Sequence, residues 1–425
     1  MFRIKTALLA ILAAGFATTG SGAVTAFVGA RVFDGTGKPA MEKATVVVRD
    51  GKIEAVGASV KPPAGAQIIN VAGKTIIPGL INTHGHVGEV KGLRSGPDVY
   101  TRDNILSQLG VYGRYGITTV FSLGGDKEAA FKIRDEQETI QLNRARVYVA
   151  GTIIPPGISP EEARKMVDEV AAMKPNIVKI RVDDNLGASQ KMAPAEYKAV
   201  IDEAHKNGLR LAVHLYYLDD AKEVLKAGAD MIAHSIRDKD VDAELISLLK
   251  ARNIVVCPTL TREVSTFVYE STPKFFSDPF FTREVGKDII DQLNDPQKQL
   301  AMKNSKSAQQ YKASLQVANR NLKKLSDSGV GIVMGTDTGP AARFQGYFEH
   351  MELEMMTKAG LTPMQALMSA TGDAAKFMKL SGKIGSLQPG AWADIVVLDK
   401  NPLDDITNTK TIDSVWIAGN RVQRD

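Results

Sequence analysis

The sequence predicts a (β/α)8 barrel over residues 81–382, joined to a small β-sandwich domain that both ends of the chain form together. In the middle of the chain, apolar runs rich in valine and isoleucine alternate with amphipathic helical patterns. Both ends consist of short β-rich runs separated by turns. Eight strand–helix units in about 300 residues have the size of such a barrel. A doubly wound open sheet is the competing topology, but the chain shows no glycine-rich loop for dinucleotide phosphates.

The first β-rich end covers residues 24–80 and the second covers residues 383–425. In the first, runs at 27–35, 44–56 and 67–71 are rich in β-branched residues, and Asp50-Gly51 inside the second run predicts a hairpin turn. The C-terminal end has runs of the same kind at 393–399 and 414–422. Two similar ends around a different middle predict one domain built from both.

The predicted barrel strands begin with the run that ends at His84. Seven further apolar runs follow, at 117–123, 146–151, 177–182, 210–215, 230–234, 254–260 and 331–336. The helical patterns between them include 160–173, 194–207, 218–227, 241–252 and 307–328. The long, phenylalanine-rich segment 262–306 interrupts this order after the seventh strand. Long connections of this kind serve as lids or binding loops, and an oligomer contact is the alternative.

Residues 1–23 have the pattern of a secretory signal peptide. Arg3 and Lys5 precede an apolar run at 8–17 that is short for a bilayer span, and small residues follow at 21–23. We therefore expect cleavage near Val24, a periplasmic or secreted protein, and no stable membrane insertion afterwards; a retained N-terminal anchor is the alternative. Cys257 is the chain's single cysteine and lies in an apolar run, so we expect a buried, unreactive thiol.

The composition is that of an ordinary globular protein, with 44% hydrophobic and 24% charged residues. The formal net charge is +5, and it becomes +3 when the two basic residues of the predicted signal peptide are removed. This small excess does not indicate nucleic acid or an acidic membrane as a partner. We expect a small-molecule or dipeptide-like substrate, and the sequence leaves a homo-oligomer open.

Polar residues gather where the predicted barrel strands end. Catalytic groups of such barrels sit at the C-terminal ends of the strands. His84 and His86 are two residues apart on an extended strand, so both side chains can reach one metal ion. Four of the six histidines of the chain fall at strand ends together with one aspartate, and this donor set suits zinc, with manganese or iron as alternatives. The predicted ligands are His84, His86, Lys179, His214, His234 and Asp337.

Lys179 lies between β-branched neighbours in the fourth predicted strand. Burial and nearby cations both favour its neutral amine, which can take up carbon dioxide and become an anionic carbamate able to bridge two metal ions. The alternative is an ion pair with Asp183 or Asp184 at the barrel rim.

Several motifs resemble the metal-dependent amidohydrolase superfamily, in the imidazolonepropionase-like and prolidase-like branch with a binuclear centre and a carboxylated lysine. The likeness rests on segment 78–86, which ends in His84-Gly85-His86, on Gly335-Thr336-Asp337, and on segments 360–363, 370–375 and 382–394.

The resemblance implies two divalent cations. His84, His86 and Asp337 would hold the first, His214 and His234 the second, and a CO2-derived carbamate on Lys179 would bridge them together with a hydroxide. Asp337 would act as general base and acid.

Three further residues are candidates for substrate binding. Tyr216 follows His214 by two residues, and the resemblance implies that it contacts the substrate. Arg237 follows the sixth-strand histidine and could bind an anionic group. His350 opens the helix after Asp337, where the resemblance implies a residue near the pocket. His205 has the setting of a solvated residue near a helix end.

These observations predict hydrolysis of a C–N amide bond in a small peptide-like substrate, such as an Xaa-Pro dipeptide or an N-acyl amino acid. A cyclic amidase or an imidazolonepropionase-like ring-opening enzyme is the first alternative. A lactonase or phosphotriesterase would use the same metals, and a non-catalytic metal-binding protein is the remaining alternative.

Overall fold

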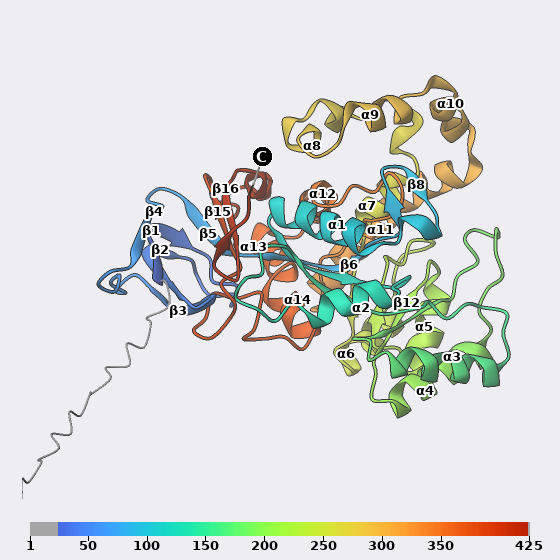
Figure 1. The fold of residues 1–425 in the computed structure, drawn as a ribbon. Coiled ribbons are helices and arrows are strands. Elements are labelled where there is room, and N and C mark those ends of the chain that lie inside the picture. Colours follow the sequence, from blue (N-terminus) through green and yellow to red (C-terminus); the bar gives the residue numbers. More distant parts are fainter. Residues whose placement is uncertain (1–23, 424–425) are drawn as a thin grey trace, which may run out of the picture.

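The structure is a computed structural model that describes residues 24–423, so the predicted signal peptide lies outside the described residues. One sheet combines strands from both ends of the chain, in the order β17-β16-β15-β5-β1-β2-β3, with β4 also pairing with β1. It lies at one side of the helical body in Figure 1. Its strands are β1 (Val24–Val32), β2 (Met41–Arg49), β3 (Lys52–Gly57), β4 (Gln67–Asn70), β5 (Thr75–Pro78), β15 (Ile395–Leu398), β16 (Ile412–Ile417) and β17 (Asn420–Arg421).

The two ends of the chain meet where β5 pairs antiparallel with β15, with Ile395 opposite Pro78. Asp50 and Gly51 both have positive φ values, 49° and 72°, and join β2 to β3 where Arg49 pairs with Lys52. Positive φ at both positions belongs to the tight hairpin turn whose twist matches the strands. The hairpin predicted at this pair is therefore present.

The middle of the chain forms a barrel of parallel strands. Two sheets, β10-β9-β6 and β11-β12-β13-β14, are joined by parallel bridges from Ile154 to Ile180, from Val256 to Ile332 and from Gly85 to Thr338. These bridges bring the eighth segment, 332–338, between β14 and β6 and complete the ring. The predicted (β/α)8 fold is confirmed and the open sheet is excluded. The strands are β6 (Leu80–Gly85), β9 (Ile117–Ser122), β10 (Arg146–Val149), β11 (Val178–Arg181), β12 (Leu211–His214), β13 (Met231–Ile232) and β14 (Val255–Val256).

Helices follow the strands and cover the barrel. Ser159 illustrates how the sequence starts them: its side chain accepts a hydrogen bond from the Glu162 amide, and Pro160 occupies the first turn. The helices are α1 (Arg102–Arg114), α2 (Glu128–Asp135), α3 (Pro160–Ala172), α4 (Pro194–Lys206), α5 (Leu218–Ala227), α6 (Ala243–Ala251), α11 (Lys306–Asp327), α12 (Tyr347–Lys358), α13 (Pro363–Ser369) and α14 (Gly372–Phe377). Among the described residues, none of these helices is both long and apolar enough to cross a membrane.

The long segment after β14 folds into short helices, and Figure 1 shows α8 to α10 beyond α1 and α12. Aromatic contacts anchor its first half: Phe281 packs against Phe344 and Tyr347, and the Tyr115 hydroxyl donates to the Phe280 carbonyl over 2.8 Å. Whether the segment serves as a lid or as an oligomer contact stays a prediction. Its elements are α7 (Leu260–Ser265), η2 (Val268–Glu270), η3 (Lys274–Ser277), α8 (Pro279–Thr282), α9 (Lys287–Leu293) and α10 (Pro296–Asn304); a small hairpin, β7 (Val90–Lys91) and β8 (Arg94–Ser95), and the turns η1 (Pro97–Val99) and η4 (Ile406–Lys410) complete the chain.

Candidate metal centre

The first and eighth barrel segments carry His84, His86 and Asp337 to one place. The Nε2 atoms of His84 and His86 lie 3.5 Å and 2.9 Å from Asp337 Oδ1. The backbone amides of Thr336 and Asp337 both donate to the His84 carbonyl, over 3.1 Å and 2.6 Å. The alternation of side chains predicted for the His84-Gly85-His86 motif thus places both rings beside the same carboxylate.

The close contact between these segments depends on Gly335. A Cβ atom at this position would lie 2.4 Å from Cys257 Sγ and 2.8 Å from His84 Cβ. Cys257 is buried, as predicted. The absence of a side chain at Gly335 therefore allows the eighth segment to approach the histidine strand.

Asp337 has an unusual backbone and a strongly polar setting. Its φ value of 58° lies in the left-handed region that residues other than glycine rarely adopt, and such conformations concentrate at functional sites. The Arg343 guanidinium lies 2.5 Å from Asp337 Oδ2. Burial alone would raise the pKa of this carboxyl, but Arg343 and the two histidines hold the pKa well below its usual range. Asp337 is therefore ionised at neutral pH.

His234 and His214 approach from the neighbouring strands. The His234 ring is fully buried, and its Nδ1 lies 2.7 Å from Thr259 Oγ1. Its centroid is 4.7 Å from the His84 ring and 4.1 Å from the His214 ring. Burial lowers the pKa of His214 to about 4 despite its contact with Asp183, so the ring is neutral, the form that binds metals.

Asp183 is a partner that sequence reasoning did not assign to His214. Its Oδ2 lies 3.1 Å from His214 Nε2, and its Oδ1 accepts from Arg181. An acid that contacts one ring nitrogen orients the imidazole and increases its basicity toward a metal. The sequence signal for this contact was the position of Asp183 just after the fourth strand, because that strand pairs with the fifth strand, which ends at His214.

Lys179 is buried among these groups, with 2% of its surface exposed. Its Nζ lies 3.3 Å from His84 Nε2, and among the described residues no carboxylate oxygen comes within ion-pair distance of it. The alternative pairing with Asp183 or Asp184 is therefore absent, since Asp184 accepts instead from the Tyr217 hydroxyl. Burial lowers the pKa of Lys179 to about 8, which makes the neutral amine accessible near neutral pH.

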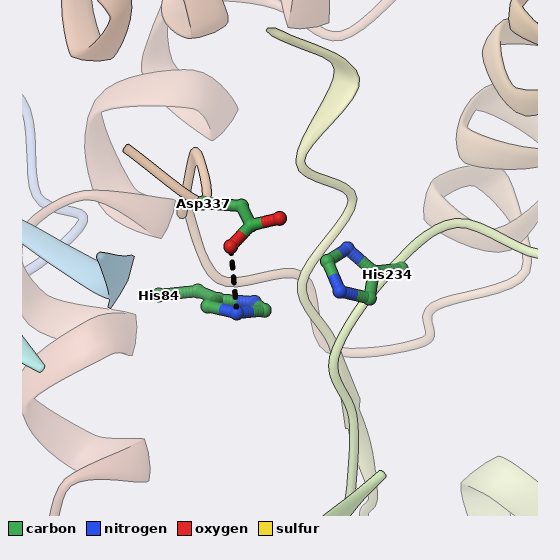
Figure 2. A group of neighbouring side chains, drawn as sticks. All are labelled: His84, His234 and Asp337. Carbon is green, nitrogen blue, oxygen red and sulfur yellow. Dashed lines mark ion pairs between the residues drawn. The ribbon is translucent and has the colours of Figure 1, made fainter. Parts of the chain in front are cut away.

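A metal ion fits this donor set. Ligand atoms of His84, His234 and Asp337 all lie within 4.8 Å of one another, and Figure 2 shows His84 below the Asp337 carboxylate with His234 facing both from the side. His84 Nδ1 and His234 Nε2 are buried and have no hydrogen-bond partner among the described residues. Buried polar atoms are normally satisfied, so unpaired imidazole nitrogens in a cluster that also holds a carboxylate fit a metal-binding site. How the six predicted ligands divide between two ions stays a prediction.

The three predicted substrate-binding residues, Tyr216, Arg237 and His350, all contact other side chains or the backbone of the protein. The Tyr216 hydroxyl pairs with Ser314, and the Arg237 guanidinium lies 4.7 Å over the Tyr216 ring. Arg237 is fully buried: its Nη1 donates to two backbone carbonyls, and its Nε lies 2.9 Å from Glu263.

His350 does not join the cluster. Its Nδ1 lies 2.9 Å from Thr409 Oγ1, and its Nε2 lies 2.8 Å from the Tyr115 carbonyl oxygen. Both ring nitrogens are therefore used in holding α12 against α1 and η4, and the structure does not support a substrate role. His205 is half-exposed and pairs with Asp230, in agreement with the solvated setting expected for it.

A buried carboxylate behind the site also escaped sequence reasoning. Glu349 Oε1 accepts from Asn82 Nδ2 and from the hydroxyls of Thr336 and Thr338, over 2.6 to 2.8 Å, and its Oε2 accepts from the Gly346 amide over 2.6 Å. Asn82 in turn accepts from the His84 amide. Glu349 thus connects the histidine strand to the residues on both sides of Asp337. A glutamate near the start of a helix has the ordinary appearance of a helix cap, so its pattern carried no separate signal.

Solved structures of similar fold cover nearly the whole chain. A Xaa-Pro dipeptidase with bound methionine in its active site superposes with a TM-score of 0.75 at 20% identity, covering 94% of this chain and 99% of the other. Ochratoxinase from Aspergillus niger superposes with a TM-score of 0.73 at 20% identity, covering 95% and 96%. These identities show a shared fold.

Sequence comparisons find relatives of the same kinds. The chain is 24% identical to Aspergillus niger ochratoxinase over 338 residues, which are 76% of this chain and 60% of the relative. The chain thus spans about three fifths of that relative's length. Imidazolonepropionase from Streptomyces avermitilis is 22% identical over 425 aligned positions, covering 90% and 88%. The model of the amidohydrolase family matches residues 75–422, from the strand before the histidine pair to the last strand of the terminal sheet. The chain therefore belongs to the amidohydrolase family.

Proposed function

We propose that this protein is a metal-dependent hydrolase that cleaves the C–N amide bond of a small peptide-like substrate carrying a free carboxylate, such as an Xaa-Pro dipeptide or an N-acyl amino acid. The observation that carries the proposal is the buried cluster of His84, His234 and Asp337 next to the buried Lys179; within residues 24–423, two ring nitrogens of the cluster have no hydrogen-bond partner and the lysine has no acidic partner. The similarity to a Xaa-Pro dipeptidase supports this substrate class.

The residues present fit two divalent cations, with zinc the first choice for a histidine and carboxylate set. His84, His86, His214, His234 and Asp337 would hold them. Lys179 would complete the set after its neutral amine attacks carbon dioxide: a new N–C bond forms, one N–H proton is released to solvent, and a carbamate anion results. When bound there, such cations would supply Lewis acidity toward the amide carbonyl and make a hydroxide nucleophile available at neutral pH.

The protein's own residues account for the proton transfers. Asp337 is ionised in the folded protein, so its carboxylate can accept the proton of the attacking oxygen. It then delivers that proton to the nitrogen of the leaving amine as the C–N bond breaks. Arg343, at 2.5 Å from Oδ2, keeps the carboxylate charged and leaves Oδ1 toward the histidines.

The substitution Asp337→Asn tests the proton-transfer role. Wild-type protein and the variant are loaded with zinc and assayed against dipeptides and N-acyl amino acids, with metal content measured by elemental analysis. The variant should retain most of its metal and lose about 10² to 10⁴-fold in kcat, the usual contribution of general acid–base catalysis. Full activity of the variant, or an active wild-type protein without a transition metal, would refute the proposal.

The carbamate has its own measurement. Wild-type protein equilibrated with carbon-13 bicarbonate and zinc should show a carbamate resonance that is missing from the Lys179→Met variant. Identical spectra for the two proteins would remove the carbamate from the proposal without affecting the histidine and aspartate ligands.

Ring opening of a cyclic amide is the second candidate function. The similarity to imidazolonepropionase along 90% of the chain favours it. Cyclic amides therefore belong in the same substrate screen, and a preference for them over linear dipeptides would decide between the two.

We also propose that the protein is exported, with residues 1–23 removed. The support is the sequence pattern of that segment alone. Determining the N-terminal residue of protein recovered from the periplasm or medium tests it, with Val24 or a near neighbour expected.

A further inference from the structure

The first helix of the long segment after β14 begins at the metal centre. Thr259, which contacts His234 Nδ1, is the residue before α7. Glu352 holds this helix start, because its two carboxylate oxygens accept from the Leu260 and Thr261 amides over 2.8 Å and 2.7 Å. A buried acid that caps a helix in this way sets its direction. Side chains of α7 therefore have fixed positions relative to His234.

Arg262 occupies the face of α7 that is turned toward Asp337. Residues three apart lie on the same face of a helix, and Ser265 is three residues after Arg262. Ser265 Oγ accepts from Arg343 Nε over 3.1 Å, and Arg343 in turn contacts Asp337. On its other side the Arg262 guanidinium lies 4.5 Å over the Tyr311 ring.

Hydrogen bonds connect Tyr311 to the part of the metal centre that contains His214. The Tyr311 hydroxyl donates to Asn185 Oδ1 over 3.0 Å, and the Asn185 amide donates to Asp183, the partner of His214. The guanidinium of Arg262 thus lies between the Asp337 side and the His214 side of the centre.

Arg237 and Arg262 share one carboxylate and keep unpaired N–H groups. Both side chains are buried, and among the described residues both form ion pairs with Glu263, at 2.9 Å and 3.2 Å. Arg237 Nη2 and Arg262 Nε have no hydrogen-bond partner among these residues. A buried charged donor without a partner is unfavourable, and an anion that accepts from it removes this cost.

Arg262 is better placed than Arg237 to receive that anion. Arg237 is 1% exposed and its Nη1 already donates to the Leu215 and Ser235 carbonyls. Arg262 is 7% exposed, and in the part of the chain that the structure describes its one hydrogen bond beyond Glu263 is a long 3.5 Å contact with the Tyr311 hydroxyl. A planar guanidinium with open N–H groups matches a carboxylate in bidentate geometry.

We propose that Arg262 binds the free carboxylate of the substrate, with Tyr311 beneath its guanidinium, so that α7 selects substrates bearing that anion. This inference rests on the proposed amide hydrolysis and assigns its specificity to one residue. Arg237 is then a positioning residue, which holds Glu263 and packs on Tyr216.

Paired substrates test the role of Arg262. Each dipeptide or N-acyl amino acid is compared with its C-terminal amide, which has the same scissile bond but no carboxylate. The wild-type protein should prefer the acid by about 10 to 100-fold in kcat/KM, the range for hydrogen bonds to a charged group. Arg262→Met should abolish this preference, because kcat/KM for the acid should fall far more than kcat/KM for the amide. Arg262→Lys should keep part of it, since lysine supplies the charge but not the planar fork.

Arg320→Met is the matched control, because Arg320 is exposed on α11 and its one ion pair among the described residues is with Asp240. It should behave as wild type. Equal losses for acid and amide in Arg262→Met would show a merely structural role and overturn the assignment. So would a wild-type protein with no preference for the acid.

A binding measurement separates this inference from the proposed function. Calorimetry on zinc-loaded protein compares the N-acetyl amino acid with its amide, whether or not either is cleaved. Tighter binding of the acid to wild-type protein, lost in Arg262→Met, supports the carboxylate site even if hydrolysis is absent. Equal binding of acid and amide overturns it even if hydrolysis is observed.

Discussion

Glu349 offers the sharpest test of how the two halves of the metal centre are held together. Replacing it with alanine removes the acceptor for four donors: Asn82 Nδ2, the hydroxyls of Thr336 and Thr338, and the Gly346 amide. The two hydroxyls lie 2.9 Å apart and can pair with each other. Asn82 Nδ2 also lies 2.9 Å from Thr336 Oγ1 and 3.3 Å from Thr338 Oγ1, so among the described residues the Gly346 amide is the donor left without a substitute. A buried donor without a partner costs about 1–3 kcal/mol and the cavity left by the side chain adds to this, so we expect a loss of roughly 2–6 kcal/mol in the free energy of unfolding.

Glu349→Gln should cost less. Its carbonyl can replace Oε1, and only the Gly346 amide then faces an N–H group in place of an acceptor. The expected loss is about 1–3 kcal/mol. Because Asn82 accepts from the His84 amide, Glu349→Ala should also weaken zinc binding, whereas Glu349→Gln should largely keep it.

Urea unfolding followed by circular dichroism measures the stability change, and zinc titration measures the effect on the site. Glu354→Gln is the matched control, since it makes the same substitution on α12 at a residue that pairs with Lys410 and Lys358. It should change stability by less than about 1 kcal/mol. A Glu349→Ala protein as stable as this control, with unchanged zinc affinity, would refute the reasoning.

Three other perturbations address the contact between the domains, the close strand approach and the lysine. Arg146 and Asp394 form a buried ion pair between the barrel and the terminal sheet, at 3.2 Å; Arg146→Met should cost about 3–5 kcal/mol in urea unfolding, and adding Asp394→Leu should recover part of it. Gly335→Ala places a methyl group 2.4 Å from Cys257 Sγ, so it should lower stability by about 1–3 kcal/mol and weaken zinc binding; wild-type zinc affinity would contradict the close contact. Lys179 has a folded pKa of about 8 against an ordinary value of 10.5, so the unfolded chain binds more protons between these values. Metal-free wild-type protein in carbon dioxide-free buffer should therefore gain stability relative to Lys179→Met as the pH rises through this window, and parallel stability curves would contradict the shift.

The sequence by itself determined the fold class and the residue types of the centre. Alternating apolar runs and helical patterns specify a barrel because burial requires those periods. Parallel strands bring their carboxyl ends to one face of the barrel, so the sequence alone predicts that polar residues at the ends of separate apolar runs lie close together. His84, His234 and Asp337, from the first, sixth and eighth strands, do lie together.

Only the tertiary structure decided which groups support and surround that centre. Four supporting residues each make a contact with a residue distant in sequence: Asp183 with His214, Arg262 with Tyr311, Arg343 with Ser265 and Glu349 with Asn82. Side-chain contacts across such separations leave no periodic signal. The same limit explains His350, whose place near the start of a helix suggested a pocket residue although its ring joins Tyr115 to Thr409. The same limit applies to Arg237. The sequence shows that Arg237 is close to the predicted ligand His234, but its burial against Glu263 depends on where α7 packs. Local patterns place residues on strands, whereas packing decides which of them remain open to a substrate.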